Sequence, residues 1–227
     1  MIVLSIDTAL EACSAAVFDS ERDAIIAANT AMMARGHAEA LMPLLDGVMR
    51  AAGIDFFDLD RVAVTVGPGS FTGLRVGIAA ARGIGLAAKK PVLGVTTLAA
   101  LAAPSLAADS NQPVAAVIDG RHRHVYFELY GPQGRVLLSP RIIPVEEAAH
   151  AAEAASASLV GSGARMMTEV WSDPMNLPRC DDRGAPDIAW VARLGARLQL
   201  REAPPKPLYL RPPDAHPQTA AILPRRT

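Results

Sequence analysis

The order of short apolar segments is the feature of this sequence that most restricts its fold. Three such segments open the chain with polar, turn-like residues between them, and apolar residues at helical spacing follow. A β-branched strand, a second helix, another short strand and an Ala/Leu-rich helix ending near Pro104 complete the first half. The strands are predicted at residues 2–6, 13–18, 24–28, 61–66 and 91–93, and the first two helices at residues 36–52 and 70–89. The order is therefore βββ-α-β-α-β-α.

A similar order of elements returns in the second half, although no residue-level repeat is visible. Strands are predicted at residues 114–118, 125–130, 136–143 and 159–160, and helices at residues 145–155 and 187–200. This repetition predicts an α/β protein with two related lobes, residues 1–104 and 105–211, joined where prolines and polar residues break the pattern. From Arg201 onward the chain has seven prolines in 27 residues, so we expect residues 212–227 to form a flexible, Pro-rich tail.

Charge and cysteine content exclude several classes of protein. Lys and Arg number 22 against 23 Asp and Glu, a net charge of −1, so we do not expect the chain to bind nucleic acid unaided. Cys13 and Cys180 lie far apart and form no pattern typical of zinc or disulfides, which fits a reduced, cytoplasmic setting. The N-terminus reads as a strand and not as a signal peptide, and no apolar stretch predicts a membrane span.

A glycine-rich segment between a predicted strand and a predicted helix is the most conspicuous motif. It spans residues 67–77 and reads Gly-Pro-Gly-Ser-Phe-Thr-Gly-Leu-Arg-Val-Gly, where a phosphate-binding loop would lie. The third glycine comes one residue too late for a dinucleotide fingerprint, and the lysine of a Walker A loop is missing. A tight turn followed by a closely packed helix, which Ser70 can cap, remains the alternative to a phosphate site.

Small residues form a stripe along this predicted helix. Gly73, Gly77, Ala81 and Gly85 recur at every fourth position, so another backbone can approach closely. Glycine inside a helix costs about 1 kcal/mol relative to alanine, which implies a compensating packing requirement. The sequence leaves two partners open, the chain's own sheet and a helix from another subunit.

Asp7 and Thr8 end the first predicted strand, where a carboxylate could orient a metal-bound phosphate or merely cap a turn. Glu11 would place a second negative charge beside a bound phosphate, so we expect weak or absent nucleotide binding at a vestigial site. The chain has three further candidate ligands for a metal, namely His37, His122 and His124. None has a partner at a spacing typical of a metal site, and we predict structural roles for them.

Several segments together resemble the TsaB family over nearly the whole chain to about residue 211. They are Ser5-Ile6-Asp7-Thr8, residues 36–43 (Gly-His-Ala-Glu-Ala-Leu-Met-Pro), the glycine-rich segment at residues 67–75, Asp119-Gly120-Arg121 with Val125-Tyr126, and Leu208-Tyr209-Leu210-Arg211. The resemblance implies an actin-like, or ASKHA, fold in each lobe. It also implies a role in forming N6-threonylcarbamoyladenosine in tRNA next to the anticodon, together with a TsaD-like catalytic subunit and a TsaE-like ATPase.

A comparison with TsaD suggests that this chain is not itself the transferase. TsaD has a His-Met-Glu-Gly-His type of metal motif, whereas the matching stretch here is Thr97-Leu98-Ala99-Ala100-Leu101. Threonine and leucine cannot replace the two imidazole ligands. We therefore expect no catalytic residue, no metal and no cofactor, which also argues against a metallopeptidase. An independent ASKHA-type phosphotransferase is the alternative function.

The resemblance implies that the two long N-terminal helices bind the partner. The predicted interface residues are His37, Leu41, Leu44, Leu45, Val48, Phe71, Gly73, Leu74, Gly77 and Ala81. A homodimer is possible when the chain is alone. Contact with tRNA is expected only through the complex, and no membrane partner is expected.

Overall fold

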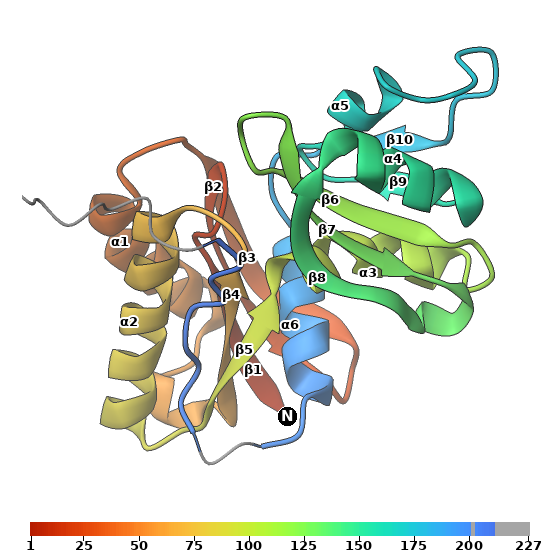
Figure 1. Ribbon diagram of the computed structural model, residues 1–227. Coiled ribbons are helices and arrows are strands. Elements are labelled where there is room, and N and C mark those ends of the chain that lie inside the picture. The colour runs from red at the N-terminus through yellow and green to blue at the C-terminus, as the bar shows by residue number, and fades with distance from the viewer. Residues whose placement is uncertain (201–202, 212–227) are drawn as a thin grey trace, which may run out of the picture.

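Two five-stranded sheets form the framework of the computed structural model, which describes residues 1–200 and 203–211 (Figure 1). The first half of the chain contains β1 (Ile2–Asp7), β2 (Ala12–Asp19), β3 (Ala24–Met32), α1 (His37–Ala52), η1 (Phe56–Asp58), β4 (Arg61–Gly67), α2 (Phe71–Ala88), β5 (Val92–Thr96) and α3 (Thr97–Ala108). The second contains β6 (Val114–Asp119), β7 (His124–Tyr130), η2 (Pro132–Gly134), β8 (Val136–Pro144), α4 (Val145–Ala154), β9 (Ser158–Val160), α5 (Ala164–Thr168), β10 (Cys180–Asp181) and α6 (Ile188–Arg197).

The two sheets share one topology. The first has the strand order β3-β2-β1-β4-β5 and the second the order β10-β9-β6-β7-β8, which is the same order read from the other edge. In each sheet the first three strands are antiparallel and the last two join in parallel. This duplication confirms the predicted α/β class with two actin-like lobes, because a repeated βββαβα order produces it.

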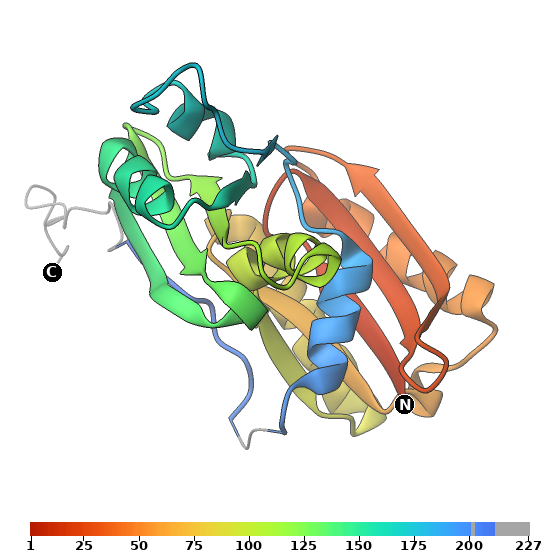
Figure 2. The ribbon, with the colours of Figure 1, turned by 90° about the vertical axis from the view of Figure 1, so that its right-hand side faces the viewer.

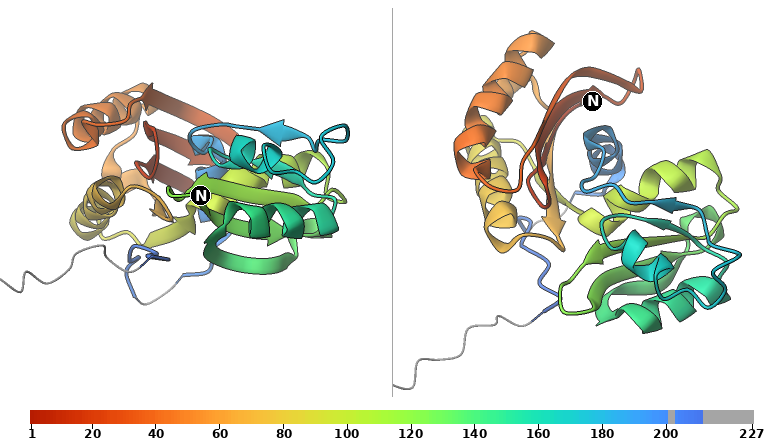
Figure 3. Two further views of the ribbon diagram at one scale, coloured as in Figure 1. Left: turned by 45° about the horizontal axis from the view of Figure 1, so that its top comes forward. Right: turned by 90° about the horizontal axis from the view of Figure 1, so that it is seen from above.

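Helices cover both faces of the first sheet. Every residue of β2 is buried, as expected of a strand with helices on both sides. Helices α1 and α2 lie side by side on the outer face, and α6 lies on the inner face between the lobes (Figure 3). The apolar face of α1 packs on this sheet, and Gly53 ends the helix in a left-handed conformation (φ 67°).

The last helix of each half packs on the sheet of the other half. Helix α6, from the second half of the chain, contacts β1, β2 and β4, whereas α3 contacts β6 (Figure 2). Gly195 allows this approach, because a methyl group there would overlap the side chain of Ala63. Arg61 fastens the end of α6 by donating to the carbonyl oxygens of Gly195, Ala196 and Leu198 at 3.3, 3.3 and 2.9 Å.

Several predicted boundaries differ from the observed ones. Helix α3 continues through Pro104 to Ala108, so the proposed lobe boundary at residue 104 falls inside a helix, and the division into lobes stays a prediction. Strand β3 is longer than predicted, and α5 and β10 were not predicted. The tail predicted at residues 212–227 lies outside the described residues. Within the described residues, no helix is long and apolar enough to cross a membrane.

Candidate functional site

The end of β1, where a nucleotide phosphate would be expected, is filled by the glycine-rich segment of the same chain. The hydroxyl of Thr8 donates to the carbonyl oxygen of Gly73 (2.7 Å), and the N–H of Ser70 donates to the carbonyl oxygen of Ala9 (2.7 Å). The Ser70 hydroxyl accepts from Gly73 N–H at 3.3 Å, which confirms its role as the N-cap of α2. The structure thus supports the reading as a tight turn followed by a closely packed helix.

The carboxyl group of Asp7 is buried at this point. Its Oδ1 accepts hydrogen bonds from the hydroxyl of Thr65 (2.6 Å) and the N–H of Ala9 (3.1 Å). Its Oδ2 has no hydrogen-bond partner among the described residues. Burial raises the pKa of Asp7, and the hydrogen bonds from Thr65 and Ala9 and the nearby His37 only partly oppose this shift. The arrangement favours a structural carboxyl group that holds the turn after β1.

The stripe of small residues on α2 packs against the chain's own sheet. A methyl group at Gly73 would overlap the backbone of Thr8, and one at Gly77 would overlap its hydroxyl. Gly85 is equally close to the side chain of Val92, and Ala81 is fully buried. Of the two partners left open by the sequence, the structure selects the intramolecular one for this stripe.

Nine of the ten predicted interface residues are buried in the first lobe. Only Phe71 is exposed, with 52% of its surface accessible, and the other nine are His37, Leu41, Leu44, Leu45, Val48, Gly73, Leu74, Gly77 and Ala81. Their burial within this chain does not favour contact with a partner, because helical spacing identifies an apolar face without saying what covers it, and the assignment of these nine residues to an interface stays a prediction. A charge at such a position would test folding and not association.

The opposite faces of α1 and α2 are exposed and mix apolar side chains with charged ones, namely Glu39, Asp46, Arg50, Arg75 and Arg82. Met42 is 55% exposed and Leu86 is 84% exposed. Gly47 lies in the interior of α1 and Gly83 in that of α2, and a methyl group at either would have no neighbour within 4 Å in the described part of the chain. Sequence reasoning missed both, although a glycine inside a helix and away from the buried stripe was the available signal.

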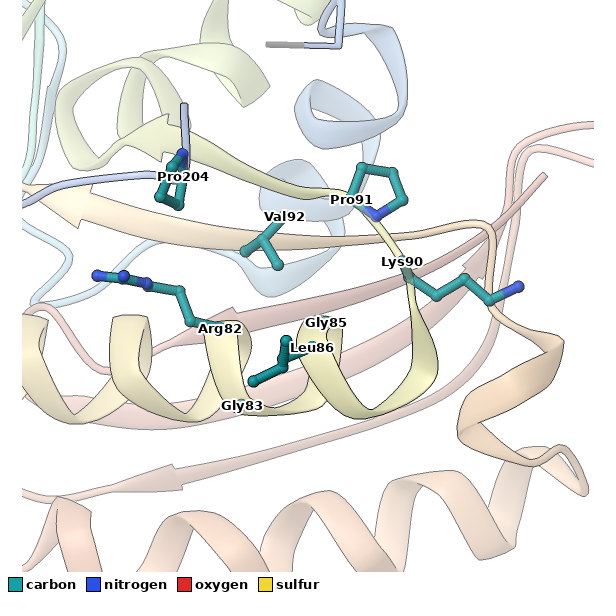
Figure 4. Close-up of a pocket in the computed structure, with 8 residues that line it drawn as sticks. All are labelled: Arg82, Gly83, Gly85, Leu86, Lys90, Pro91, Val92 and Pro204. Atoms are coloured by element: carbon teal, nitrogen blue, oxygen red, sulfur yellow. The ribbon is translucent and has the colours of Figure 1, made fainter. Parts of the chain in front are cut away.

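A hollow of about 480 Å³ lies beside the C-terminal half of α2 (Figure 4). Its walls come from α2, from the turn into β5 and from Pro204 in the last described segment. Arg82 and Lys90 place two cationic side chains at its rim, and Val92 forms part of its floor. The hollow is open and lies away from the end of β1, so it is not the site of the predicted nucleotide.

The remaining candidate ligands do not gather into a metal site. Nε2 of His37 lies 3.0 Å from the carbonyl oxygen of Leu10, and Nδ1 of His124 lies 2.8 Å from that of His122. Among the described residues, no group of three or more His, Cys, Asp or Glu could hold a metal ion. Thr97 begins α3 and is fully buried, beside the apolar cluster between α3 and the second sheet.

Comparisons with known proteins agree with this geometry. Residues 27–180 match the family model for TsaD, tRNA N6-adenosine threonylcarbamoyltransferase. The solved structure of YeaZ from Pseudomonas aeruginosa superposes with a TM-score of 0.79 at 30% identity, covering 92% of this chain and 99% of that one. The TsaB protein of Haemophilus influenzae is 30% identical over 175 residues, which is 72% of each chain.

The chain belongs to the TsaB family.

The TsaB protein of Escherichia coli gives a further alignment, with 34% identity over 152 residues. This alignment covers 63% of the present chain and 64% of the Escherichia coli protein. Since the YeaZ structure matches over almost its full length, the two-lobed actin-like fold is common to this chain and its TsaB-family relative.

Proposed function

We propose that this TsaB-family chain is a non-catalytic subunit in the cytoplasmic formation of N6-threonylcarbamoyladenosine in tRNA. In this proposal it activates a TsaD-like catalytic subunit by binding it, and a TsaE-like ATPase completes the machinery. The similarity to the Escherichia coli and Haemophilus influenzae proteins supports the pathway, since both are tRNA threonylcarbamoyladenosine biosynthesis proteins. The match to the TsaD family model supports a partner of similar fold.

The exposed glycines of α1 and α2 are the observation that carries the proposal. Glycine inside a helix is destabilising by about 1 kcal/mol relative to alanine, and among the described residues neither Gly47 nor Gly83 has a neighbour that requires it. A helix from a partner could approach closely at both positions, while Met42 and Leu86 would bury their exposed apolar surface against it. The outer faces of α1 and of the C-terminal half of α2, around Gly83 and Leu86, therefore replace the buried faces as the proposed interface. A homodimer through the same faces is the alternative when the partner is absent.

The competing function, an independent phosphotransferase, receives less support from the end of β1. A phosphate there would have to displace the hydrogen bond between Thr8 and Gly73. Among the described residues, no group of histidine, cysteine and carboxylate side chains could hold a metal ion that would bind such a phosphate.

Reconstitution with purified components tests the proposal. Threonylcarbamoyladenosine formation should require this chain in addition to the TsaD-like and TsaE-like proteins and tRNA. Gly83→Trp should fold normally, because the position is open, yet weaken partner binding by at least about tenfold through steric overlap. Ser139→Trp, on the exposed surface of the second lobe, is the matched control and should bind normally.

Full modification without the chain, or unchanged partner binding by Gly83→Trp, would contradict the proposal. ATP turnover by the isolated chain would favour the phosphotransferase instead.

A further inference from the structure

A strap formed by residues 203–211 connects the two lobes. It returns from α6 to the first lobe, where the N–H of Leu208 donates to the carbonyl oxygen of Val66 at 2.7 Å. Three residues later, the guanidinium of Arg211 donates to the carbonyl oxygen of Gly120 in the second lobe at 3.2 Å (Figure 1, dark blue). The strap therefore joins two motifs that the proposed function does not use, Leu208-Tyr209-Leu210-Arg211 and Asp119-Gly120-Arg121.

Two aromatic rings and a cation meet where the strap crosses the start of α2. The ring of Tyr209 stacks on that of Phe71, with centroids 5.6 Å apart and planes inclined by 30°. The guanidinium of Arg75 lies 3.7 Å from the Phe71 centroid, and its Nε donates to the Tyr209 hydroxyl at 3.2 Å. Phe71 and Tyr209 remain 52% and 48% exposed. The cluster thus presents flat aromatic surface and positive charge to solvent.

The loop that accepts the strap has an uncommon backbone. Arg121, His122 and Arg123 all have positive φ values, 62°, 52° and 58°, and all three are exposed. Non-glycine residues rarely adopt this left-handed conformation, and such strain is often kept at functional positions. Hydrogen bonds hold it, since Gly120 N–H donates to the carbonyl oxygen of His124 at 2.9 Å and His124 N–H donates to that of Arg121 at 3.1 Å.

The aromatic cluster and the basic loop belong to one surface. Tyr209 and Arg211 are two residues apart, so their Cα atoms lie within about 7 Å of each other. We call this surface the strap patch and define it as Phe71, Arg75, Arg121, His122, Tyr209 and Arg211. Its three arginines have no carboxylate within salt-bridge distance among the described residues, although the chain as a whole has a net charge of −1. The nearby Asp119 carboxylate accepts the backbone N–H of Arg121 at 2.7 Å.

We infer that the strap patch binds a single-stranded segment of the RNA substrate. Phosphates would contact the cationic side chains, chiefly Arg121 and Arg211, and a base would stack on the exposed ring of Tyr209. Exposed rings beside cations are typical of proteins that hold unpaired nucleotides. A protein partner is less well matched, because the two rings are the only large apolar side chains exposed in the patch. The inference rests on the proposed function, which supplies tRNA as the substrate.

Binding of tRNA to the complex assembled from this chain and its TsaD-like partner tests the inference, by fluorescence anisotropy over a series of salt concentrations. Tyr209→Leu, which keeps apolar bulk but removes the flat ring, should weaken tRNA binding about tenfold. Tyr209→Phe should bind almost normally. Arg121→Gln should make the plot of log affinity against log salt concentration less steep by about one unit, which is the contribution of one phosphate contact. Arg135→Gln is the matched control, about 20 Å away beyond the other end of β7, and should change neither quantity.

Partner association and melting temperature, measured on the same variants, separate the possible outcomes. Weaker partner binding by Tyr209→Leu with unchanged tRNA binding would make the patch a protein contact and overturn the inference. Unchanged association and unchanged tRNA binding by both Tyr209→Leu and Arg121→Gln would also overturn it. If Tyr209→Leu melts early, Arg121→Gln decides, since among the described residues the Arg121 side chain makes no hydrogen bond or salt bridge that holds the loop. None of these results contradicts the proposed function, which depends on omission of the chain and on Gly83→Trp.

Discussion

Two glycines on one helix should respond in opposite directions to the same substitution. Gly73 and Gly83 both lie in α2, but a methyl group at Gly73 would overlap the carbonyl oxygen of Thr8, whereas one at Gly83 would have no neighbour within 4 Å. The obstacle at Gly73 is backbone, and Thr8 is further held by its hydrogen bond to the Gly73 carbonyl oxygen. Relief therefore requires movement of β1 or of α2.

The expected magnitudes follow from these surroundings. Overpacking of this kind costs about 1–3 kcal/mol, so Gly73→Ala should lower the free energy of unfolding by about 2 kcal/mol. Gly83→Ala should raise it by about 0.5–1 kcal/mol, because alanine favours the helix and restricts the unfolded chain. For a protein of this size, the two melting temperatures should differ by about 5–15 °C.

Urea unfolding of the two variants and the parent protein, followed by circular dichroism, measures both effects. The midpoints should move in opposite directions while the slope with urea concentration stays constant. A stabilised Gly73→Ala variant would refute the reasoning, because it would mean that the stripe does not meet β1. A destabilised Gly83→Ala variant would show that the outer face of α2 is covered within the chain.

Three further predictions concern buried groups. Because burial raises the Asp7 pKa, the native state holds this proton to a higher pH than the unfolded chain, so Asp7 makes stability fall as pH rises above about 4. Asp7→Asn should become more stable relative to the parent as the pH rises above about 4, and parallel urea-unfolding profiles would contradict this. Burial, and to a lesser extent the charge of Asp7, raises the pKa of the Cys13 thiol to about 11. An alkylating reagent at pH 8 should therefore modify the exposed Cys180 before Cys13. Labelling of Cys13 before Cys180 would contradict this prediction. Arg61→Gln should lower the free energy of unfolding by about 1.5–3 kcal/mol and speed hydrogen exchange in α6, because three hydrogen bonds to the end of that helix are lost. A decrease of less than about 0.5 kcal/mol would contradict the role of Arg61 at the end of α6.

Local patterns in the sequence predicted most of the elements, but not the partners of their faces. The spacing of Leu41, Leu44, Leu45 and Val48 predicted α1 correctly, because an apolar face at helical spacing depends on neighbours a few residues away. What covers that face is decided by strands that are distant in the chain. The stripe of small residues on α2 was likewise predicted without its partner. Its close contact is with Thr8 of the same chain, whereas the sequence also allowed a helix from another subunit.

Short elements and long-range contacts were the main omissions. Strand β10 has two residues and α5 has five, which is too few to show a period. The contacts of the strap with the first lobe through Leu208 and with the second through Arg211 were not predicted. A single hydrogen bond to the carbonyl oxygen of Gly120 leaves no pattern in the sequence, because any residue could provide that oxygen.

The exchange of α3 and α6 between the lobes has a consequence for the chain as it leaves the ribosome. The strands of the first sheet are complete at Thr96, but the helix that covers its inner face begins at Ile188. At about 5–20 residues per second, synthesis of the intervening segment takes about 5–20 s. During this interval the surface around Phe18 and Ala63 faces water on the nascent chain, which makes it a binding site for a ribosome-associated chaperone. Expression of the first lobe alone would extend that exposure indefinitely and lead to aggregation.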